Sequence, residues 1–287
     1  MFSSSLCDDS RDPLALLAEG NPLEPMIHVT LDDVGNCGKD GMAAVVGYVA
    51  YKEQWEAFNW AWKKTLADFG LEYLHTSNYI YRYPRVGDHP PTDEELFKIL
   101  DPWIDIVYLY LLKPGTGLGI CVIVPCADYE QLTAKEKQFV REPALTAFEL
   151  AVGFACWHVK GDLSALNGMA VQMDETQNAC SLYERYQFLK NENQTLKKYL
   201  SAIAFTDDKR HWPVQAADML GHLTLRTWRQ YQADPTREWP GAFTKLVFPE
   251  GSRTVASRVF GLDRLRRLAR LRMELQDKAA IPDDKAL

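Results

Sequence analysis

Three aspartates stand at positions where a metal-dependent hydrolase would need them. Asp32 and Asp174 each follow a mostly apolar run of residues (27–31 and 169–173), and Asp218 lies within an apolar helical pattern. A buried aspartate is costly unless it is paired, hydrogen-bonded or bound to a cation. Carboxylates that lie close together raise each other's pKa, and a divalent ion such as Mg²⁺ or Mn²⁺ relieves that repulsion. These positions predict a metal site if the fold brings them together.

Further residues stand close enough in the sequence to assist such a site. Asp33 adjoins Asp32, but successive strand side chains point to opposite faces, so only one of the two faces a given side. Asp207 and Lys209 follow a third apolar run, and His75 ends a fourth. We expect Asp33 and Asp207 as outer or alternate metal ligands, and Lys209 and His75 as phosphate contacts or proton-transfer helpers. The chemistry that suits this set is attack of a metal-bound water on a phosphodiester, and the alternative for each acid is a solvated strand end.

The spacing of apolar residues predicts the elements that would position these side chains. Predicted strands cover Ile27–Leu31, Gly41–Tyr51, Leu71–His75, Ile120–Val124, Met169–Met173 and Ala202–Phe205. Predicted helices cover Lys52–Phe69, Thr92–Leu112, Pro143–Val159, Gln177–Leu200, Pro213–Arg229 and Gly261–Lys278. The nearly all-apolar helix Pro143–Val159 is too short to span a bilayer and is best placed against a sheet.

Composition narrows the class of protein. The chain has 287 residues, of which 47% are hydrophobic and 25% charged, as is typical of a soluble globular protein. The formal net charge of −7 argues against a protein held on nucleic acid by overall positive charge, although it allows a local basic track. No stretch is apolar for long enough to span a membrane, and residues 1–25 do not resemble a secretory signal. We therefore expect no membrane association and a cytoplasmic location.

The cysteines agree with a reducing environment. None of them forms a CxxC pair with metal-ligand spacing, so we expect reduced, buried thiols. The six are Cys7, Cys37, Cys121, Cys126, Cys156 and Cys180.

Basic residues occur in three places that suit contact with nucleic acid. A tyrosine-rich segment contains Arg82 and Arg85, a composition that can stack on bases and contact phosphates. Lys209 and Arg210 follow an acidic doublet. The basic amphipathic helix predicted at Gly261–Lys278 can follow a phosphate backbone, or dock on a protein partner or a second copy of the chain. The alternative in each case is a surface that packs on its own domain or faces solvent.

Five short motifs resemble, in matching order, those of the domain-of-unknown-function 3800 family. They are Asp32-Asp33-Val34-Gly35-Asn36, His75-Thr76-Ser77, Met173-Asp174-Glu175, Phe205-Thr206-Asp207-Asp208-Lys209 and Gln215-Ala216-Ala217-Asp218-Met219. The resemblance spans about residues 26–228. It implies an RNase H-like α/β fold with a mixed central sheet. It also implies a metal-dependent nuclease that uses Mg²⁺ or Mn²⁺ in a phage, mobile-element or defence context.

Carried over to this chain, the resemblance makes three aspartates the metal ligands: Asp32, Asp174 and Asp218. Asp33 takes the place of the family's glutamate, Val34 that of a serine, and Asp208 that of the serine before the lysine. These replacements also favour an alternative, a catalytically inactive RNase H-like module that binds nucleic acid or a protein partner. The expected parts are a lead-in (1–25), an RNase H-like domain (26–235) and a C-terminal extension with the basic helix (236–287).

Overall fold

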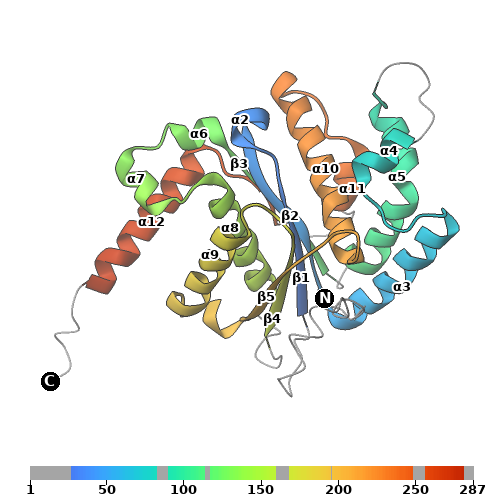
Figure 1. Ribbon diagram of the computed structural model, residues 1–287. Coiled ribbons are helices and arrows are strands. Elements are labelled where there is room, and N and C mark those ends of the chain that lie inside the picture. The colour runs from blue at the N-terminus through green and yellow to red at the C-terminus, as the bar shows by residue number, and fades with distance from the viewer. Residues whose placement is uncertain are drawn as a thin grey trace, which may run out of the picture.

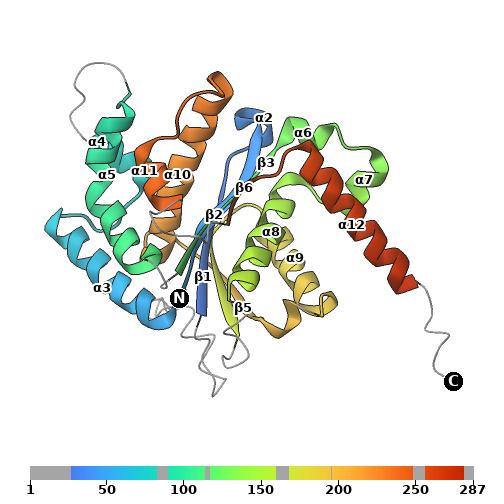
Figure 2. The ribbon, with the colours of Figure 1, turned by 180° about the vertical axis from the view of Figure 1, so that it is seen from behind.

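The computed structural model describes residues 27–82, 90–113, 117–159, 168–194, 196–247 and 256–280. Within them a six-stranded sheet forms the middle layer, and helices cover both of its faces (Figures 1 and 2). The chain is thus an α/β protein with a mixed central sheet flanked by helices, as its sequence predicts. No helix in the described part of the chain is both long enough and apolar enough to cross a bilayer.

The sheet has a mixed topology. Its strands are β1 (Ile27–Val34), β2 (Met42–Tyr51), β3 (Gly117–Pro125), β4 (Met169–Asp174), β5 (Leu200–Thr206) and β6 (Ala256–Val259). They lie in the order β5-β4-β1-β2-β3-β6. β1, β2 and β3 are antiparallel neighbours, whereas β4 runs parallel to β1, β5 to β4, and β6 to β3. The predicted C-terminal extension thus contributes β6 to the same sheet.

The helices form two layers (Figure 1). One face of the sheet carries α3 (Lys52–Asp68), α4 (Thr76–Arg82), α5 (Asp93–Val107) with the π-helical turn η1 (Tyr108–Leu112), α10 (Trp212–Ala233) and α11 (Gly241–Val247). The other face carries α6 (Cys126–Glu130), α7 (Ala134–Phe139), α8 (Pro143–His158), α9 (Ala179–Glu192) and α12 (Leu262–Ala280). The short helix α2 (Cys37–Asp40) connects β1 to β2, and the 3-10 turn η2 (Leu196–Lys198) precedes β5.

Side-chain alternation along β2 divides the interior into two hydrophobic cores. Val46 and Tyr48 pack with α3, α5 and α10, whereas Val45 and Val49 pack with α8 and α9 on the opposite face. Because helices cover both faces, the first nine residues of β2 are all buried. This accounts for the long uninterrupted apolar run in the sequence, where a half-exposed strand would alternate with polar residues.

The prediction of a strand at Leu71–His75 is wrong. The segment runs without regular structure into α4, and side chains of α10, not a neighbouring strand, hold its backbone. Leu74 N donates to Gln215 Oε1 at 3.0 Å. The N–H of Thr76, the first residue of α4, donates to Asp218 Oδ2 at 3.0 Å.

The tyrosine-rich segment expected as a loop begins as a helix. Tyr79 lies in α4 and is buried, while Tyr81 on the same helix is exposed. Arg82 is the last residue of α4, and Arg85 lies outside the described residues. The predicted contact of this segment with bases and phosphates therefore stays a prediction.

The expectation of reduced thiols is wrong for one pair of cysteines. Cys37, the first residue of α2, forms a disulfide with Cys126, the first residue of α6. They are 89 residues apart in the sequence, but antiparallel pairing of β2 with β3 brings the start of one strand beside the end of the other. Cys121 and Cys156 are buried free thiols, as expected, and Cys180 is an exposed one.

The predicted basic helix is α12, and its apolar stripe is only partly covered. Leu265 and Ala269 pack into the core formed with α8. Leu271 and Leu275 are exposed. The C-terminal end of α12 projects from the body (Figure 1). Arg272 anchors the helix through an ion pair with the buried Glu149 of α8.

Candidate functional site

Asp32 and Asp174 lie side by side on neighbouring strands. The parallel pairing of β1 with β4 sets Leu31 opposite Met173, so the next residue on each strand is one of the two aspartates. Leu31 and Met173 both pack into the core formed with α8. Since side chains alternate along a strand, Asp32 and Asp174 share the opposite face, which α10 covers.

Helix α10 brings a third aspartate, Asp218, to this face. It lies close against β1 at Gly221, where a Cβ atom would lie 2.6 Å from Val34 Cγ2 and 2.9 Å from Asp32 Oδ2. The missing side chain at position 221 therefore allows the helix to lie directly against the end of β1. Asp218 precedes Gly221 by three residues and lies on the same side of the helix.

Burial and mutual repulsion raise the pKa of both strand aspartates. Asp32 is 8% exposed, and its pKa is raised well above the ordinary 3.8 by burial first and then by the charges of Asp218, Asp174 and Asp33. Burial also raises the pKa of Asp174 to about 7, with a further contribution from the charge of Asp208. The fold thus brings the three predicted ligands near enough for their charges to interact.

Two aspartates follow β5, and Asp208 interacts with the other acids of the site more strongly than the predicted Asp207 does. The pKa of Asp208 is raised by burial, by a hydrogen bond with Asp207 and by the charge of Asp218. The Asp207 carboxylate instead accepts a hydrogen bond from Lys209 N at 3.0 Å, which lowers its pKa. The sequence shows the doublet, but it does not tell which acid of a turn faces the site. We call Asp32, Asp174, Asp208 and Asp218 the acid cluster.

Gln215 fixes the surroundings of the acid cluster, a role that the sequence alone does not indicate. This fully buried side chain accepts hydrogen bonds at Oε1 from Trp62 Nε1 (2.9 Å) and Leu74 N (3.0 Å). Its Nε2 donates to Asp208 O at 2.8 Å. Gln215 therefore ties α3, the segment before α4 and the turn after β5 to the helix that carries Asp218.

Asp33 lies on the other face of the sheet, as strand alternation predicts. Its Oδ2 accepts hydrogen bonds from Thr176 Oγ1 (2.9 Å) and Asn178 Nδ2 (3.4 Å), just before α9. Its charge still contributes to the raised pKa of Asp32 and Asp174. Asp33 is therefore a neighbour of the acid cluster whose carboxylate has polar partners of its own.

The predicted phosphate contacts border the acid cluster. His75 Nδ1 lies 3.0 Å from Ser77 Oγ, and the charge of His75 lowers the pKa of Asp208. Lys209 and Arg210 are exposed on the turn that follows Asp208. All three basic residues thus lie at the edge of the acid cluster. His75 is partly buried, whereas Lys209 and Arg210 are exposed.

The acid cluster is loosely arranged. Within the described ranges, no group of three or more His, Cys, Asp or Glu side chains is placed so that it could hold a metal ion. The donor set is nevertheless all carboxylate, which is the ligand chemistry that Mg²⁺ and Mn²⁺ prefer. Carboxylates that repel one another come together when a cation neutralises their charge. The side chains present therefore fit such an ion in their chemistry.

The tight approach of α10 to β1 leads to a prediction. Gly221→Ala is expected to lower the free energy of unfolding by about 1–3 kcal/mol, because the added methyl group must displace Val34 or Asp32. The matched control is Gly153→Ala in α8, where nothing lies within 4 Å of a new Cβ atom. This control is expected to gain about 0.5–1 kcal/mol from helix propensity. Urea unfolding followed by circular dichroism measures both, and equal changes would contradict the close packing.

The raised pKa of Asp174 predicts how stability depends on pH. With a folded pKa of about 7 and an ordinary value of 3.8, the folded state holds a proton that the unfolded state releases between these limits. The metal-free protein should therefore lose stability relative to Asp174→Asn as pH rises from about 4 to about 7. The difference should reach about 1–2 kcal/mol, allowing for solvent screening of this half-exposed side chain. Thermal melts in chelator across this range test it, and a constant difference would refute it.

Comparison with known proteins does not identify a family for this chain. The sequence matches no model of a protein family, and no curated protein matches it. The structure is that of an α/β protein whose mixed sheet carries a group of carboxylates at the carboxyl ends of two parallel strands.

Proposed function

We propose that this chain is a divalent-metal-dependent nuclease or phosphodiesterase with an RNase H-like fold. One observation carries the proposal. Asp32 and Asp174 lie side by side on the neighbouring parallel strands β1 and β4, and Asp218 lies across from them on α10. No ion pair among the described residues involves any of these three acids. Carboxylates held close together without a cationic partner are typical of sites that bind divalent cations.

The sheet supports the fold part of the proposal. An antiparallel β1-β2-β3 unit, extended by β4 and β5 parallel to β1, agrees with the RNase H-like fold implied by the five sequence motifs. All five of those motifs contribute to the acid cluster or its edge. The fifth supplies Gln215 and Asp218 on one helix, where both side chains accept hydrogen bonds from the segment that contains His75.

Each residue has a proposed role. Asp32, Asp174 and Asp218 would hold Mg²⁺ or Mn²⁺, with Asp208 as a further ligand. A bound ion would supply charge neutralisation for the phosphodiester and a more acidic water. His75, next to Asp208, would move a proton to or from the reacting phosphate group, and Lys209 would contact a neighbouring phosphate.

A metal titration combined with a cleavage assay tests the proposal. Mn²⁺ should raise the melting temperature and chelator should reverse the rise, because an ion bound only by the folded state stabilises it. Single- and double-stranded DNA and RNA should be tested for cleavage with Mg²⁺ and with Mn²⁺. Asp218→Asn should abolish both effects, although its amide oxygen can still accept the hydrogen bond from Thr76 N. The control is Glu184→Gln on the exposed side of α9, which should change neither.

One observation favours a second function, that of a catalytically inactive module. Among the residues that the structure describes, no three side chains of the acid cluster are placed so that they could hold an ion. A module that binds nucleic acid or a protein partner through this surface would need no metal. Intact substrates and an unchanged melting temperature with either ion would support the module and overturn the nuclease.

A further inference from the structure

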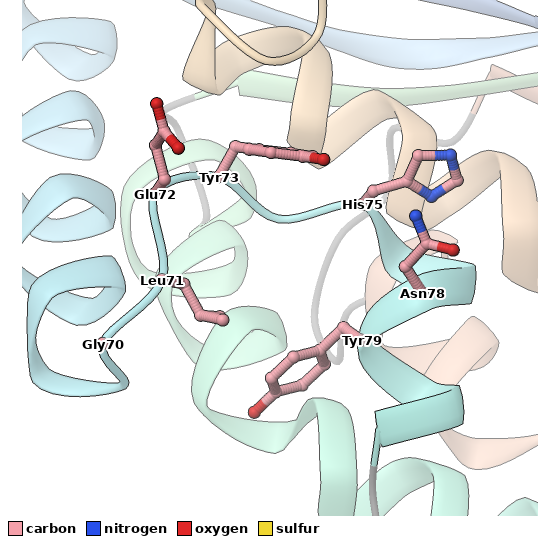
Figure 3. A pocket seen from close by; sticks show the side chains of 7 residues that line it. All are labelled: Gly70, Leu71, Glu72, Tyr73, His75, Asn78 and Tyr79. Atoms are coloured by element: carbon pink, nitrogen blue, oxygen red, sulfur yellow. The ribbon is translucent and has the colours of Figure 1, made fainter.

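A pocket of about 220 Å³ lies beside the acid cluster, between the segment that follows α3 and the first turns of α4 (Figure 3). Tyr73, His75, Asn78 and Tyr79 contribute to its wall. In Figure 3 the Leu71 side chain points toward the Tyr79 ring, and Asn78 lies next to the His75 imidazole. The wall therefore combines aromatic rings with an amide and an imidazole.

The wall is held in place by defined contacts at both ends. Gly70 ends α3 in the left-handed conformation (φ +64°), and Leu71 N donates back to Leu66 O at 2.8 Å. This arrangement turns the chain sharply out of the helix. At the other end, Gln215 and Asp218 of α10 accept the backbone N–H groups on either side of His75. The helix that carries an acid of the candidate site therefore also fixes the pocket.

We infer that this pocket accepts one unpaired nucleobase of the nucleic acid whose phosphate meets the acid cluster, an inference that rests on the proposed function. A base offers flat aromatic faces and an edge of hydrogen-bond donors and acceptors. The Tyr73 ring provides a face for stacking, and the Asn78 amide provides both a donor and an acceptor for the edge. Tyr79 is packed against Phe69 and Trp103, with ring centroids 6.4 and 5.8 Å away, and forms a rigid floor.

The size of the pocket limits its occupant. Pockets for drug-sized ligands measure about 300–1,000 Å³, so this smaller one suits a single base or nucleoside. His75 joins the pocket to the acid cluster, because it lines the pocket and its charge acts on Asp208. A nucleotide whose base fills the pocket would thus direct its phosphate toward the acids.

The charge of the protein also favours recognition through a base. With a net charge of −7, the chain has little overall attraction for a phosphate backbone. Stacking of one base on an aromatic side chain contributes about 1–3 kcal/mol and is independent of that charge. A base in a duplex is stacked and paired already, so the pocket selects a single-stranded or locally opened strand.

Binding of small nucleosides tests the pocket without any need for catalysis or for a metal. Saturation-transfer NMR in chelator should show binding of adenosine and cytidine but not of ribose, which lacks only the base. Asn78→Ala and Tyr73→Leu should each weaken binding about 5- to 100-fold, as expected for the loss of one stacking or edge contact. Asn78 is exposed, so its variant should fold like the wild type. The matched controls are Asn191→Ala and Tyr183→Leu on the exposed face of α9, which should bind like the wild type.

The outcomes separate this inference from the proposed function. Equal binding of adenosine and ribose, or unchanged binding in both pocket variants, would overturn the pocket even if the protein cleaves nucleic acid. Selective binding of adenosine by a protein that cleaves nothing with Mg²⁺ or Mn²⁺ would support the pocket and overturn the nuclease. If both hold, the pocket variants should raise KM for single-stranded substrate more than they lower kcat.

Discussion

Asp32→Asn is expected to stabilise the metal-free protein and to abolish the metal-dependent cleavage that we propose for it. Burial and the charges of Asp218, Asp174 and Asp33 raise the pKa of Asp32, so its ionised form is unfavourable in the fold. Asparagine has nearly the same shape and no charge, and it should raise the free energy of unfolding by about 1–2 kcal/mol. Loss of this proposed metal ligand should lower the rate of the proposed cleavage at least about 100-fold, equivalent to about 3 kcal/mol of transition-state stabilisation.

Asp33→Asn is the matched control, since it makes the same change one residue away on the opposite face of β1. The amide oxygen of the new side chain can still accept hydrogen bonds from Thr176 and Asn178, so stability should change by less than about 0.5 kcal/mol. Chemical denaturation in chelator and single-turnover cleavage in Mn²⁺ measure the two effects. A destabilised Asp32→Asn protein would show that the charge at position 32 is compensated within the fold.

Glu149→Ala is expected to destabilise the protein by about 3–5 kcal/mol, the usual effect of removing one partner from a buried ion pair. Glu149 is 6% exposed and forms ion pairs with Arg185 of α9 and with Arg272 of α12. Arg272 also donates to Phe139 O at 2.7 Å. Removal of the carboxylate leaves two largely buried guanidinium groups near each other, and α12 should loosen first. Urea unfolding gives the free energy, and hydrogen exchange locates the loosened helix.

An exposed ion pair serves as the control for Glu149. Asp68 pairs with Lys64 on the surface of α3, and both side chains are about 60% exposed. Asp68→Ala should therefore cost no more than about 0.5 kcal/mol. A loss below about 1 kcal/mol for Glu149→Ala would mean that α12 is held mainly by apolar packing of Leu265 and Ala269.

Local periodicity was sufficient to predict most of the sheet and the long helices. β1, β2, β4 and β5 were recognisable for two reasons. A sheet that helices cover on both faces has strands with apolar sequences, and acids mark the strand ends. α3 and α5 were recognisable from an apolar stripe and, for α5, from the cap at Thr92, whose Oγ1 accepts from Glu95 N. In each case the pattern of apolar residues in an element's sequence is determined by the contacts of that element with the core.

Contacts between distant segments could not be predicted in this way. Leu71–His75 has strand-like residues, but Leu74 N and the adjacent Thr76 N donate to side chains about 140 positions later in the sequence. The Cys37–Cys126 disulfide depends on the pairing of β2 with β3, which no cysteine spacing reveals. β6 has four residues, too few for a clear alternation.

The candidate site shows the same distinction between features that local sequence predicts and features that depend on contacts between distant segments. Strand alternation alone predicted that Asp32 and Asp33 face opposite sides, and the hydrogen bonds of Asp33 agree. The contribution of Asp208 and the role of Gln215 depend on how a turn and a helix meet, which is a property of tertiary packing. Whether the acid cluster binds a metal remains a prediction that the titration tests.

The pairing of β6 with β3 determines where the chain can be shortened. Residues 256–259 cover the outer edge of β3, a long and mostly buried strand with an apolar sequence. A truncated protein ending at residue 235 would leave that edge bare, and bare apolar edges recruit strands from other molecules. Such a truncation should aggregate on expression, so the smallest unit in which this edge is covered must extend past Val259.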